Sequence, residues 1–238
     1  MTSPLRSILP KSMLLKFLVL IALATAAFAQ SNDGQLDHVL TQMDSAAASF
    51  RSLEANFVWD QYTLKPIEDV DTQKGKIYFH RQGNETLMAA DITDPHAKYI
   101  LFADGRVQMY DPKIDQVTVY NAGKNRADVE SFLVLGFGGR GHDLSKSYDV
   151  KYLSAEKIDG ADTAKLELIP KSEKLRNNIA RILLWVDSAG ISRQQQLFDS
   201  SGNYRLARYT AIQMNQKLPD GVFKLKTTGK TTVLKPQG

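Results

Sequence analysis

Three short runs of alternating apolar and polar residues fill the segment 99–120, separated by an Asp-Gly pair and an Asp-Pro pair. Asp104 and Gly105 supply the positive backbone angles that a two-residue hairpin turn requires. Pro112 fixes its own φ and has no amide hydrogen to donate, so the ladder of hydrogen bonds must break there. The segment therefore predicts an antiparallel meander of three strands.

Strand patterns extend over most of the rest of the chain. A first strand starts near Ala55, where Phe57 and Trp59 alternate with Val58 and Asp60, and further strands follow from residue 148 onward. A sheet of roughly ten or more strands must curl or split to hide its edges and its apolar face. We therefore expect a mainly β (α+β) fold, in which a large curved antiparallel sheet forms an open half-barrel. The candidate apolar faces contain Val107, Met109, Val117 and Val119 in the meander, and Leu184, Leu206, Ile212 and Met214 later in the chain.

Two segments show helical periodicity instead. From about Asp33 to Ala48, and again over Arg126–Phe137, apolar residues recur at spacings of three and four, which places them on one stripe. We expect both helices to cover the mouth of the half-barrel. There they either fill the interior completely or leave space that a ligand with apolar tails completes. The stripes consist of Leu36, Val39, Leu40, Met43 and Ala47, and of Val129, Phe132, Leu133 and Gly136.

The predicted strand Lys76–Arg81 carries a charged residue on its apolar side. Because side chains alternate along a strand, Arg81 shares a face with Ile77 and Phe79. One explanation is that Arg81 lies at the end of the strand and extends into solvent. The other is an inward-facing arginine at the mouth of a cavity. Its five donors could then bind the carbonyls of a lid or a lipid head group.

The first residues predict export. Three basic residues, an apolar run and a small-x-small sequence before Gln30 are typical of a secretory signal peptide over residues 1–29. Residues 30–238 then form the mature chain, which we expect to be one domain in the periplasm. The chain has 30 Lys and Arg against 26 Asp and Glu, and removing the leader makes it nearly neutral. That balance argues against a nucleic-acid partner.

Catalytic and metal-binding patterns are missing from the sequence. His38, His80, His96 and His142 are scattered without metal-ligand spacing, and the chain has no cysteine. Residues 136–141 match G-x-G-x-x-G, but they follow a helix-like run instead of a strand, so we interpret them as a loop. No nucleophile elbow occurs. We therefore expect neither an enzyme nor a cofactor.

Several motifs resemble one family. Gly75–Arg81 has the form G-x-hydrophobic-x-hydrophobic-x-R, and Ala103–Gly105, Tyr110–Pro112, Gln116–Thr118 and Leu218–Leu225 follow in the family's order. Together with the leader, they are similar to the periplasmic lipoprotein carriers of the LolA type over nearly the whole mature chain. The chain departs from the family's pattern after Arg81, where a proline is often found and Gln82 stands here.

The resemblance implies a monomeric half-barrel around a hydrophobic cavity that holds lipoprotein acyl chains. It implies an inner-membrane ABC-type release complex as one partner and an outer-membrane acceptor as another. In that family, the arginine at the position of Arg81 bonds to lid backbone and helps control opening. The residues expected to line the cavity or control the lid are Arg81, Ile77, Phe79, Leu36, Val39, Leu40, Met43, Phe57, Trp59, Met88, Val107, Met109, Phe132, Leu133, Leu184 and Leu206.

Two other functions fit the same shape. One is a sensor or regulatory half-barrel that binds a partner protein, and the other is a carrier of a different envelope lipid. An enzyme acting on envelope lipids is disfavoured because the sequence lacks a nucleophile pattern and a metal pattern.

Overall fold

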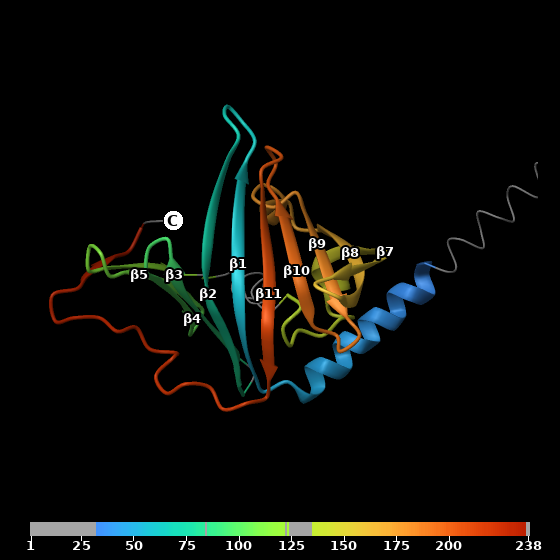
Figure 1. Ribbon diagram of the computed structural model, residues 1–238, viewed down its shortest axis with the longest axis horizontal. Helices are drawn as coiled ribbons and strands as arrows, with labels where there is room; N and C mark the ends of the chain where they lie inside the picture. The colour runs from blue at the N-terminus through green and yellow to red at the C-terminus, as the bar shows by residue number, and fades with distance from the viewer. Residues whose placement is uncertain (1–31, 84, 122, 124–134, 237–238) are drawn as a thin grey trace, which may run out of the picture.

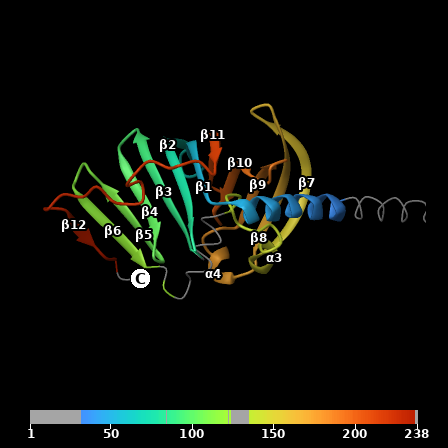
Figure 2. The same ribbon diagram turned by 90° about the horizontal axis from the view of Figure 1, so that it is seen from below.

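Twelve strands form one continuous, strongly curved sheet in the computed structural model (Figures 1 and 2). The structure describes residues 32–83, 85–121, 123 and 135–236. Within this part of the chain, helix is confined to the N-terminal helix over residues 32–49 and two single turns, α3 (Leu144–Ser147) and α4 (Glu173–Arg176). The strands are β1 (Ser52–Thr63), β2 (Asp69–Gln82), β3 (Glu85–Asp94), β4 (Lys98–Ala103), β5 (Arg106–Asp111), β6 (Gln116–Asn121), β7 (Tyr148–Ile158), β8 (Ala161–Pro170), β9 (Arg181–Asp187), β10 (Ser192–Phe198), β11 (Tyr204–Met214) and β12 (Thr232–Leu234).

The order of strands across the sheet is β12-β6-β5-β4-β3-β2-β1-β11-β10-β9-β8-β7. Every ladder is antiparallel except the short one between β12 and β6. β1 therefore joins a first wing, β2–β6 with β12 at its edge, to a second wing, β7–β11. The sheet curves without closing, which confirms the mainly β fold and the open half-barrel.

The predicted meander is present, and its turn has the expected geometry. Asp104 and Gly105 have φ of 53° and 66°, as a mirror-image hairpin turn requires. The register corrects one detail, because residues directly opposite each other share a face. Val107 lies opposite Tyr120, whereas Val117 lies opposite Tyr110. The expectation that the four valine and methionine positions of the meander form one face is therefore wrong.

Apolar residues cover the inner face of β1–β4. Phe57, Phe79 and Phe102 are fully buried there, and Phe50 and Phe137 pack over them from outside the sheet. The ring of Phe137 stacks on Phe79 with 5.0 Å between centroids. Burial of aromatic side chains on this scale dominates the stability of a core.

The N-terminal helix packs on the other wing. Val39, Leu40 and Met43 of its predicted stripe are buried, and they form a cluster with Leu184 and other residues of β7–β9. Figure 2 shows the helix, in blue, crossing the β7–β9 wing on the concave side of the sheet. The amphipathic pattern thus predicted both the helix and the side that it buries.

The C-terminal segment covers the outer face of the first wing. Tyr78 and Leu101 point outward from β2 and β4, and Phe223 and Leu225 pack against them. Phe223–Lys226 lies between turn signals at Gly221 and Gly229, which predicts a strand there. This prediction is wrong, because these residues form a turn and coil. Their apolar side chains are held by contact with the face of the sheet, which needs no ladder of hydrogen bonds.

A bulge in β11 changes which residues face inward. Ala211 has φ of 49° and lies where the register between β1 and β11 shifts. Leu206 lies opposite Asp60 on the outer face, whereas Ile212 and Met214 pack against the inner core. The expectation that Leu206 shares a face with Ile212 and Met214 is therefore wrong, because the extra residue reverses the alternation between them.

The second predicted helix does not extend to its expected end. Residues 135–138 form a turn, and Gly136 and Gly138 have φ of 76° and 83°, which a right-handed helix cannot contain. A side chain at Gly138 would lie 2.5 Å from the ring of Phe50. Most of that prediction, including Phe132 and Leu133, falls in 124–134 and so lies outside the described residues.

Gly141 gives a test of how the helix is held. A Cβ atom at this position would lie 2.3 Å from the carbonyl oxygen of Leu40, so Gly141→Ala must push the loop and the helix apart. We expect the free energy of unfolding to fall by about 1 to 3 kcal/mol, measured by chemical denaturation. Gly34→Ala is the control, because a Cβ atom at Gly34 meets nothing within 4 Å. Equal stability of the two variants would contradict this packing.

Candidate functional site

The inner face of the sheet is closed at one end and open along β4–β6. Phe57 and Phe79 are buried beneath the helix and the loop 135–144. Farther along the face, Val107 is only partly buried, and Met109 and Tyr120 are 39% and 48% exposed. The register places the side chains of these three residues on the same face. The half-barrel therefore presents an apolar surface that continues from a packed interior to solvent.

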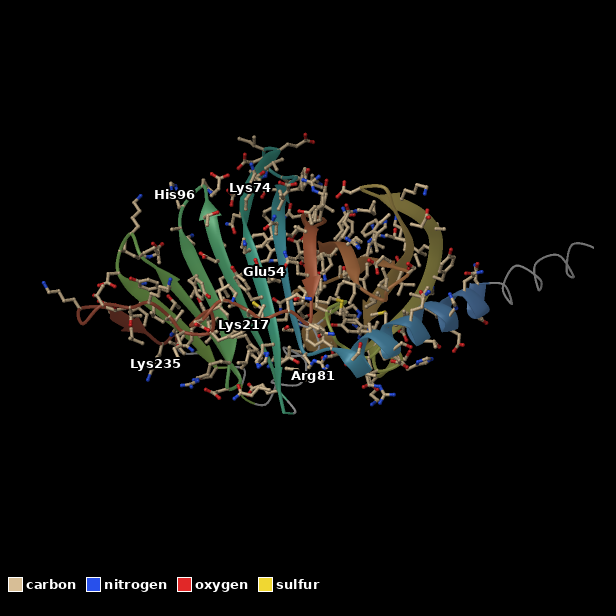
Figure 3. The ribbon with its side chains drawn as sticks, turned by 60° about the horizontal axis from the view of Figure 1, so that its bottom comes forward. Glu54, Lys74, Arg81, His96, Lys217 and Lys235 are labelled. Carbon is tan, nitrogen blue, oxygen red and sulfur yellow. The ribbon has the colours of Figure 1, made fainter. Side chains whose placement is uncertain are left out.

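Arg81 bridges the two segments that close the packed end. Its Nη1 donates to the carbonyl oxygen of Ala47 at 2.8 Å, and its Nη2 donates to the carbonyl oxygen of Gly138 at 2.5 Å. Its guanidinium also lies 5.5 Å from the centroid of the Phe50 ring. Figure 3 shows Arg81 beside the end of the N-terminal helix. Strand alternation directs the Arg81 side chain inward, on the same face as Ile77. Because β2 ends beside the C-terminal end of the helix, the guanidinium reaches the last carbonyl groups of the helix.

The bond to Ala47 has a physical reason beyond proximity. The last carbonyl groups of a helix have no partner within the helix, and that end carries a partial negative charge. A guanidinium placed there satisfies one carbonyl and complements the dipole. Because the same group also bonds Gly138, release of either segment leaves a donor of Arg81 without an acceptor. We call Arg81 with its two carbonyl partners the arginine clasp.

A second contact ties the loop to the helix farther from its end. His142 Nδ1 lies 2.6 Å from Asp44 Oδ2, and His142 Nε2 lies 3.3 Å from Asp37 Oδ1. The backbone N–H of His142 also donates to Asp44 at 3.3 Å, and Arg140 Nε lies 3.9 Å from Asp44 Oδ1. The side-chain hydrogen bond to Asp44 has the largest effect on the pKa of His142, and together with the bond to Asp37 it raises that pKa. Protonated, both ring nitrogens can donate to the two carboxylates.

Most of the predicted cavity residues gather in two groups. Ile77, Phe79, Met88 and Phe57 belong to one core cluster, and Trp59 and Val107 pack against its edge. The other cluster holds the helix residues and Leu184. Its predicted members are Val39, Leu40, Met43 and Leu184, with Leu36 packed at its margin. Met109 lies on the open part of the same inner face. Of the predicted site residues that the structure describes, only Leu206 faces outward.

Sequence reasoning missed two charged residues of the site. The sequence suggested no partner for His142, because Asp37 and Asp44 are about a hundred positions away. Arg205 points to the inner face in phase with Ala207 and Tyr209, and its guanidinium lies over the ring of Trp59. The alternation of Arg205, Ala207 and Tyr209 was a signal that could have identified it.

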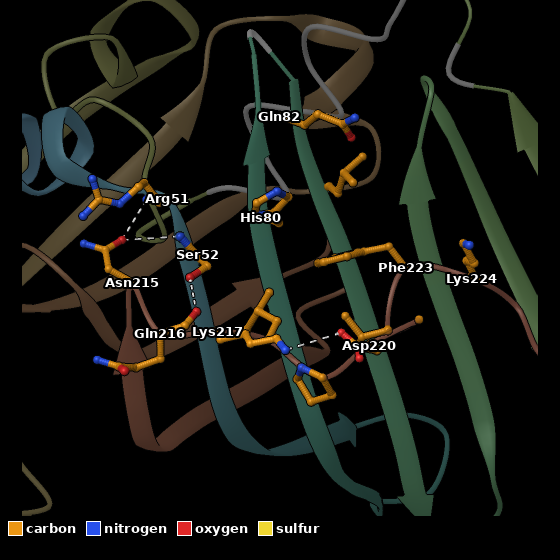
Figure 4. A pocket seen from close by; sticks show the side chains of 15 residues that line it. Arg51, Ser52, His80, Gln82, Asn215, Gln216, Lys217, Asp220, Phe223 and Lys224 are labelled. Carbon is orange, nitrogen blue, oxygen red and sulfur yellow. Dashed lines mark hydrogen bonds and ion pairs between the residues drawn. The ribbon is translucent and has the colours of Figure 1, made fainter.

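The opposite face carries a separate groove of about 710 Å³ (Figure 4). His80 and Leu87 of the sheet form one wall, and the C-terminal segment 215–224 forms the other. Ser52 Oγ donates to the carbonyl oxygen of Gln216 at 2.7 Å and holds this segment in place. The groove is separated from the inner face by the thickness of the sheet, so it is no part of the apolar surface described above.

Within the described ranges, no group of three or more His, Asp or Glu side chains could hold a metal ion. No helix in the part of the chain that the structure describes has both the length and the apolar character needed to cross a membrane.

The molecule is an open half-barrel with an apolar inner face, closed at one end by a helix and a loop that Arg81 bridges. The sequence profile described as Outer membrane lipoprotein carrier protein LolA matches residues 48–226. The chain therefore belongs to the LolA family.

Two curated relatives carry the name "Outer-membrane lipoprotein carrier protein". The one from Cupriavidus pinatubonensis is 26% identical over 223 residues, covering 92% of this chain and 98% of the relative. The one from Dechloromonas aromatica is 28% identical over 191 residues, covering 77% and 81%. Both names describe lipoprotein carriage, in agreement with the family.

Solved structures share the fold at low identity. An uncharacterized conserved protein from Thermus thermophilus aligns with a TM-score of 0.53 and 9% identity, over 84% of this chain and 98% of that one. MucB aligns with a TM-score of 0.52 and 13% identity, over 84% of this chain and 66% of the MucB chain. This chain thus spans just under two thirds of MucB. At these identities the likeness shows the fold alone.

The contact at His142 predicts a dependence of stability on pH. Because folding raises the pKa of His142, its contribution is full below the ordinary value of 6.5 and is lost as pH rises through the raised value. We expect His142→Gln to lower the melting temperature more at about pH 5.5 than at about pH 8.5. His96→Gln, in an exposed turn, is the control and should show no such difference. An effect of His142→Gln that is equal at both pH values would contradict this assignment.

Proposed function

We propose that this protein is a periplasmic carrier that binds the acyl chains of lipoproteins on the inner face of its half-barrel. It would accept them from an inner-membrane ABC-type release complex and deliver them to an acceptor at the outer membrane. Membership of the LolA family supports this proposal, as do the names of the curated relatives. We further propose that residues 1–29 are a signal peptide and that residues 30–238 act as one carrier domain without catalysis.

The observation that carries the proposal is the arginine clasp over an apolar interior. Phe50 and Phe137, which belong to the two segments that Arg81 bridges, fill the space over Phe79. An acyl chain can occupy this space only if those rings move away together with the helix and the loop. Burial of the chain is favourable by about 0.8 kcal/mol for each methylene group. The bound lipid would thus replace the protein's own aromatic side chains, and refilling by those side chains would favour its release.

The open strip along β4–β6 gives a first contact for such a chain. Val107, Met109 and Tyr120 already face solvent on the inner side, so a chain can contact them before the clasp opens. Exposed apolar surface of this kind marks sites of interaction. The strip leads to the packed interior at Phe102, which lies directly opposite Val107.

Met109→Lys tests binding on this face. A lysine there must lose water when an acyl chain covers it, so we expect the affinity for a neutral acyl probe to fall about tenfold. The measurement is a fluorescence titration with the methyl ester of cis-parinaric acid. Gln108→Lys adds the same charge one position earlier on the outer face, and it should bind the probe as the unmodified protein does. Binding by neither the unmodified protein nor the variants would overturn the carrier function.

Arg81→Leu tests the gate. Loss of two charge-assisted hydrogen bonds should destabilise the closed state by about 2 kcal/mol, which corresponds to roughly thirtyfold. Because the closed state competes with bound lipid, we expect tighter acyl binding and slower transfer of a lipoprotein to an acceptor. Arg51→Leu is the control, because the exposed neighbour Arg51 contacts Arg81 only through the backbone. Unchanged loading and release in Arg81→Leu would show that Arg81 is only structural.

A further inference from the structure

Arg205 is a cation on the inner face without an anion beside it. It lies opposite Gln61 on β1, in phase with the buried residues Ala207 and Tyr209. Its Nε is buried and has no hydrogen-bond partner. Its guanidinium lies 5.2 Å from the centroid of the Trp59 ring. Among the ion pairs of the described residues, none includes Arg205.

The neighbouring strand residues do not neutralise Arg205. Burial raises the pKa of Tyr209 to about 12, so its hydroxyl stays neutral, and it lies 3.4 Å from Gln195 Oε1. Burial lowers the pKa of Arg205, yet a guanidinium remains charged in proteins. Charges buried in proteins are normally paired. The concave face therefore holds a guanidinium that makes no ion pair with the described residues.

Other arginines of the same wing are paired. Arg208, three positions later on β11 and on the outer face, lies 2.5 Å from Asp60. Arg193 lies 2.6 Å from Asp187 on the neighbouring strand. Arg208 and Arg193 are thus held by ion pairs, whereas Arg205 makes no ion pair with the described residues. The contact that the fold provides for Arg205 is the ring of Trp59, which stabilises a cation without neutralising it.

A second donor that lacks a well-placed acceptor lies beside Arg205. The indole Nε1 of Trp59 is buried and makes no hydrogen bond of normal geometry. It lies near enough to the hydroxyl of Tyr209 to oppose the rise of that pKa, but this contact leaves the indole N–H poorly satisfied. Indole and guanidinium nitrogens can only donate, so the missing group in both cases is an acceptor. Buried donors without a good acceptor are rare, and one oxygen-rich ligand could satisfy both.

The site is reachable from solvent. A hollow of about 190 Å³ adjoins Arg205, with Leu197, Ile179 and Gln61 in its wall. Asp199 also lines the hollow, but both of its carboxylate oxygens serve its own turn. Oδ1 accepts from the backbone N–H of Ser201 at 2.8 Å, and Oδ2 accepts from Asn203 at 3.0 Å. The hollow lets a polar group reach the guanidinium, and the Trp59 ring on which the guanidinium packs lies outside the wall of the hollow.

We propose that Arg205 and Trp59 bind the anionic oxygen group, carboxylate or phosphate, of an amphiphile whose acyl chain lies along the inner face. Gln61, the partner of Arg205 on β1, is ten positions from Arg51, whose carbonyl oxygen accepts from the backbone N–H of Arg81. Ten residues of extended chain correspond to about 30 Å. The two arginines thus lie at opposite ends of one apolar surface. Arg81 holds the closure, and Arg205 selects the head group. This inference rests on the proposed binding of acyl chains and extends it to a second class of ligand, an amphiphile with an anionic head group, because the acyl chains of a lipoprotein carry no charge themselves.

Paired fluorescence titrations test the proposal. cis-Parinaric acid and its methyl ester share one acyl chain and differ in the charge of the head. We expect the unmodified protein to bind the acid at least about tenfold more tightly than the ester. Arg205→Met should bind both probes alike, at the affinity of the ester. The control Arg106→Gln removes an exposed arginine paired with Asp104, and it should keep the preference for the acid.

The possible results separate the two proposals. If the unmodified protein binds the acid and the ester equally, Arg205 has no role in selection, while acyl binding stands. If neither probe binds, the proposed carrier function fails, and this inference fails with it. Inorganic phosphate added to the acid complex distinguishes a lipid head from a free anion. Displacement of the acid by phosphate at a concentration equal to that of the probe would overturn the amphiphile as the ligand.

Discussion

Pairing of β1 with β11 is the contact on which the rest of the structure depends. The two strands are about 150 positions apart in sequence, and their ladder is the junction between the two wings of the sheet. It places Phe57 opposite Tyr209 and Trp59 opposite Ala207, which builds the floor of the inner face. It also brings Arg205 next to the Trp59 ring. Long-range pairing of this kind is costly to form because a long loop must close first.

The first wing of the sheet is apolar on both sides, and the chain buries each side differently. On the inner side, Phe50 and Phe137 cover Phe79. On the outer side, the C-terminal segment covers Tyr78 and Leu101 with Phe223 and its neighbours. Asp115 holds the far end of that segment, accepting hydrogen bonds from Thr228 and Thr231 at 2.6 Å each. The outer cover is fixed, and the inner cover depends on the arginine clasp and on His142.

Carrying a lipid requires an interior that is neither fully satisfied nor empty. A cavity left open would cost stability, and a perfectly packed core would admit no ligand. In this protein the aromatic rings of two closing segments fill the interior, and a few polar contacts hold those segments. The contacts of Arg81 and His142 are few, and under the proposed function this closure would exchange with bound lipid.

Local pattern alone determined much of this protein. Strand alternation placed Arg81 on the inner side with Ile77 and Phe79, and helical periodicity identified the buried stripe at Val39 and Met43. The Asp104-Gly105 turn fixed the meander. These features depend only on neighbours in sequence, because side-chain direction follows from the period of each element.

Tertiary structure decided what depends on register and on contact between distant segments. The bulge at Ala211 turned Leu206 outward, and strand register separated Val117 from Val107. The partners of His142 and the isolation of Arg205 arose only when the loop met the helix and β11 met β1. A shift of one residue in register reverses every side chain of a strand, and no local pattern records that shift. Sequence therefore determined the direction of side chains within each element, and the tertiary fold determined which of them meet.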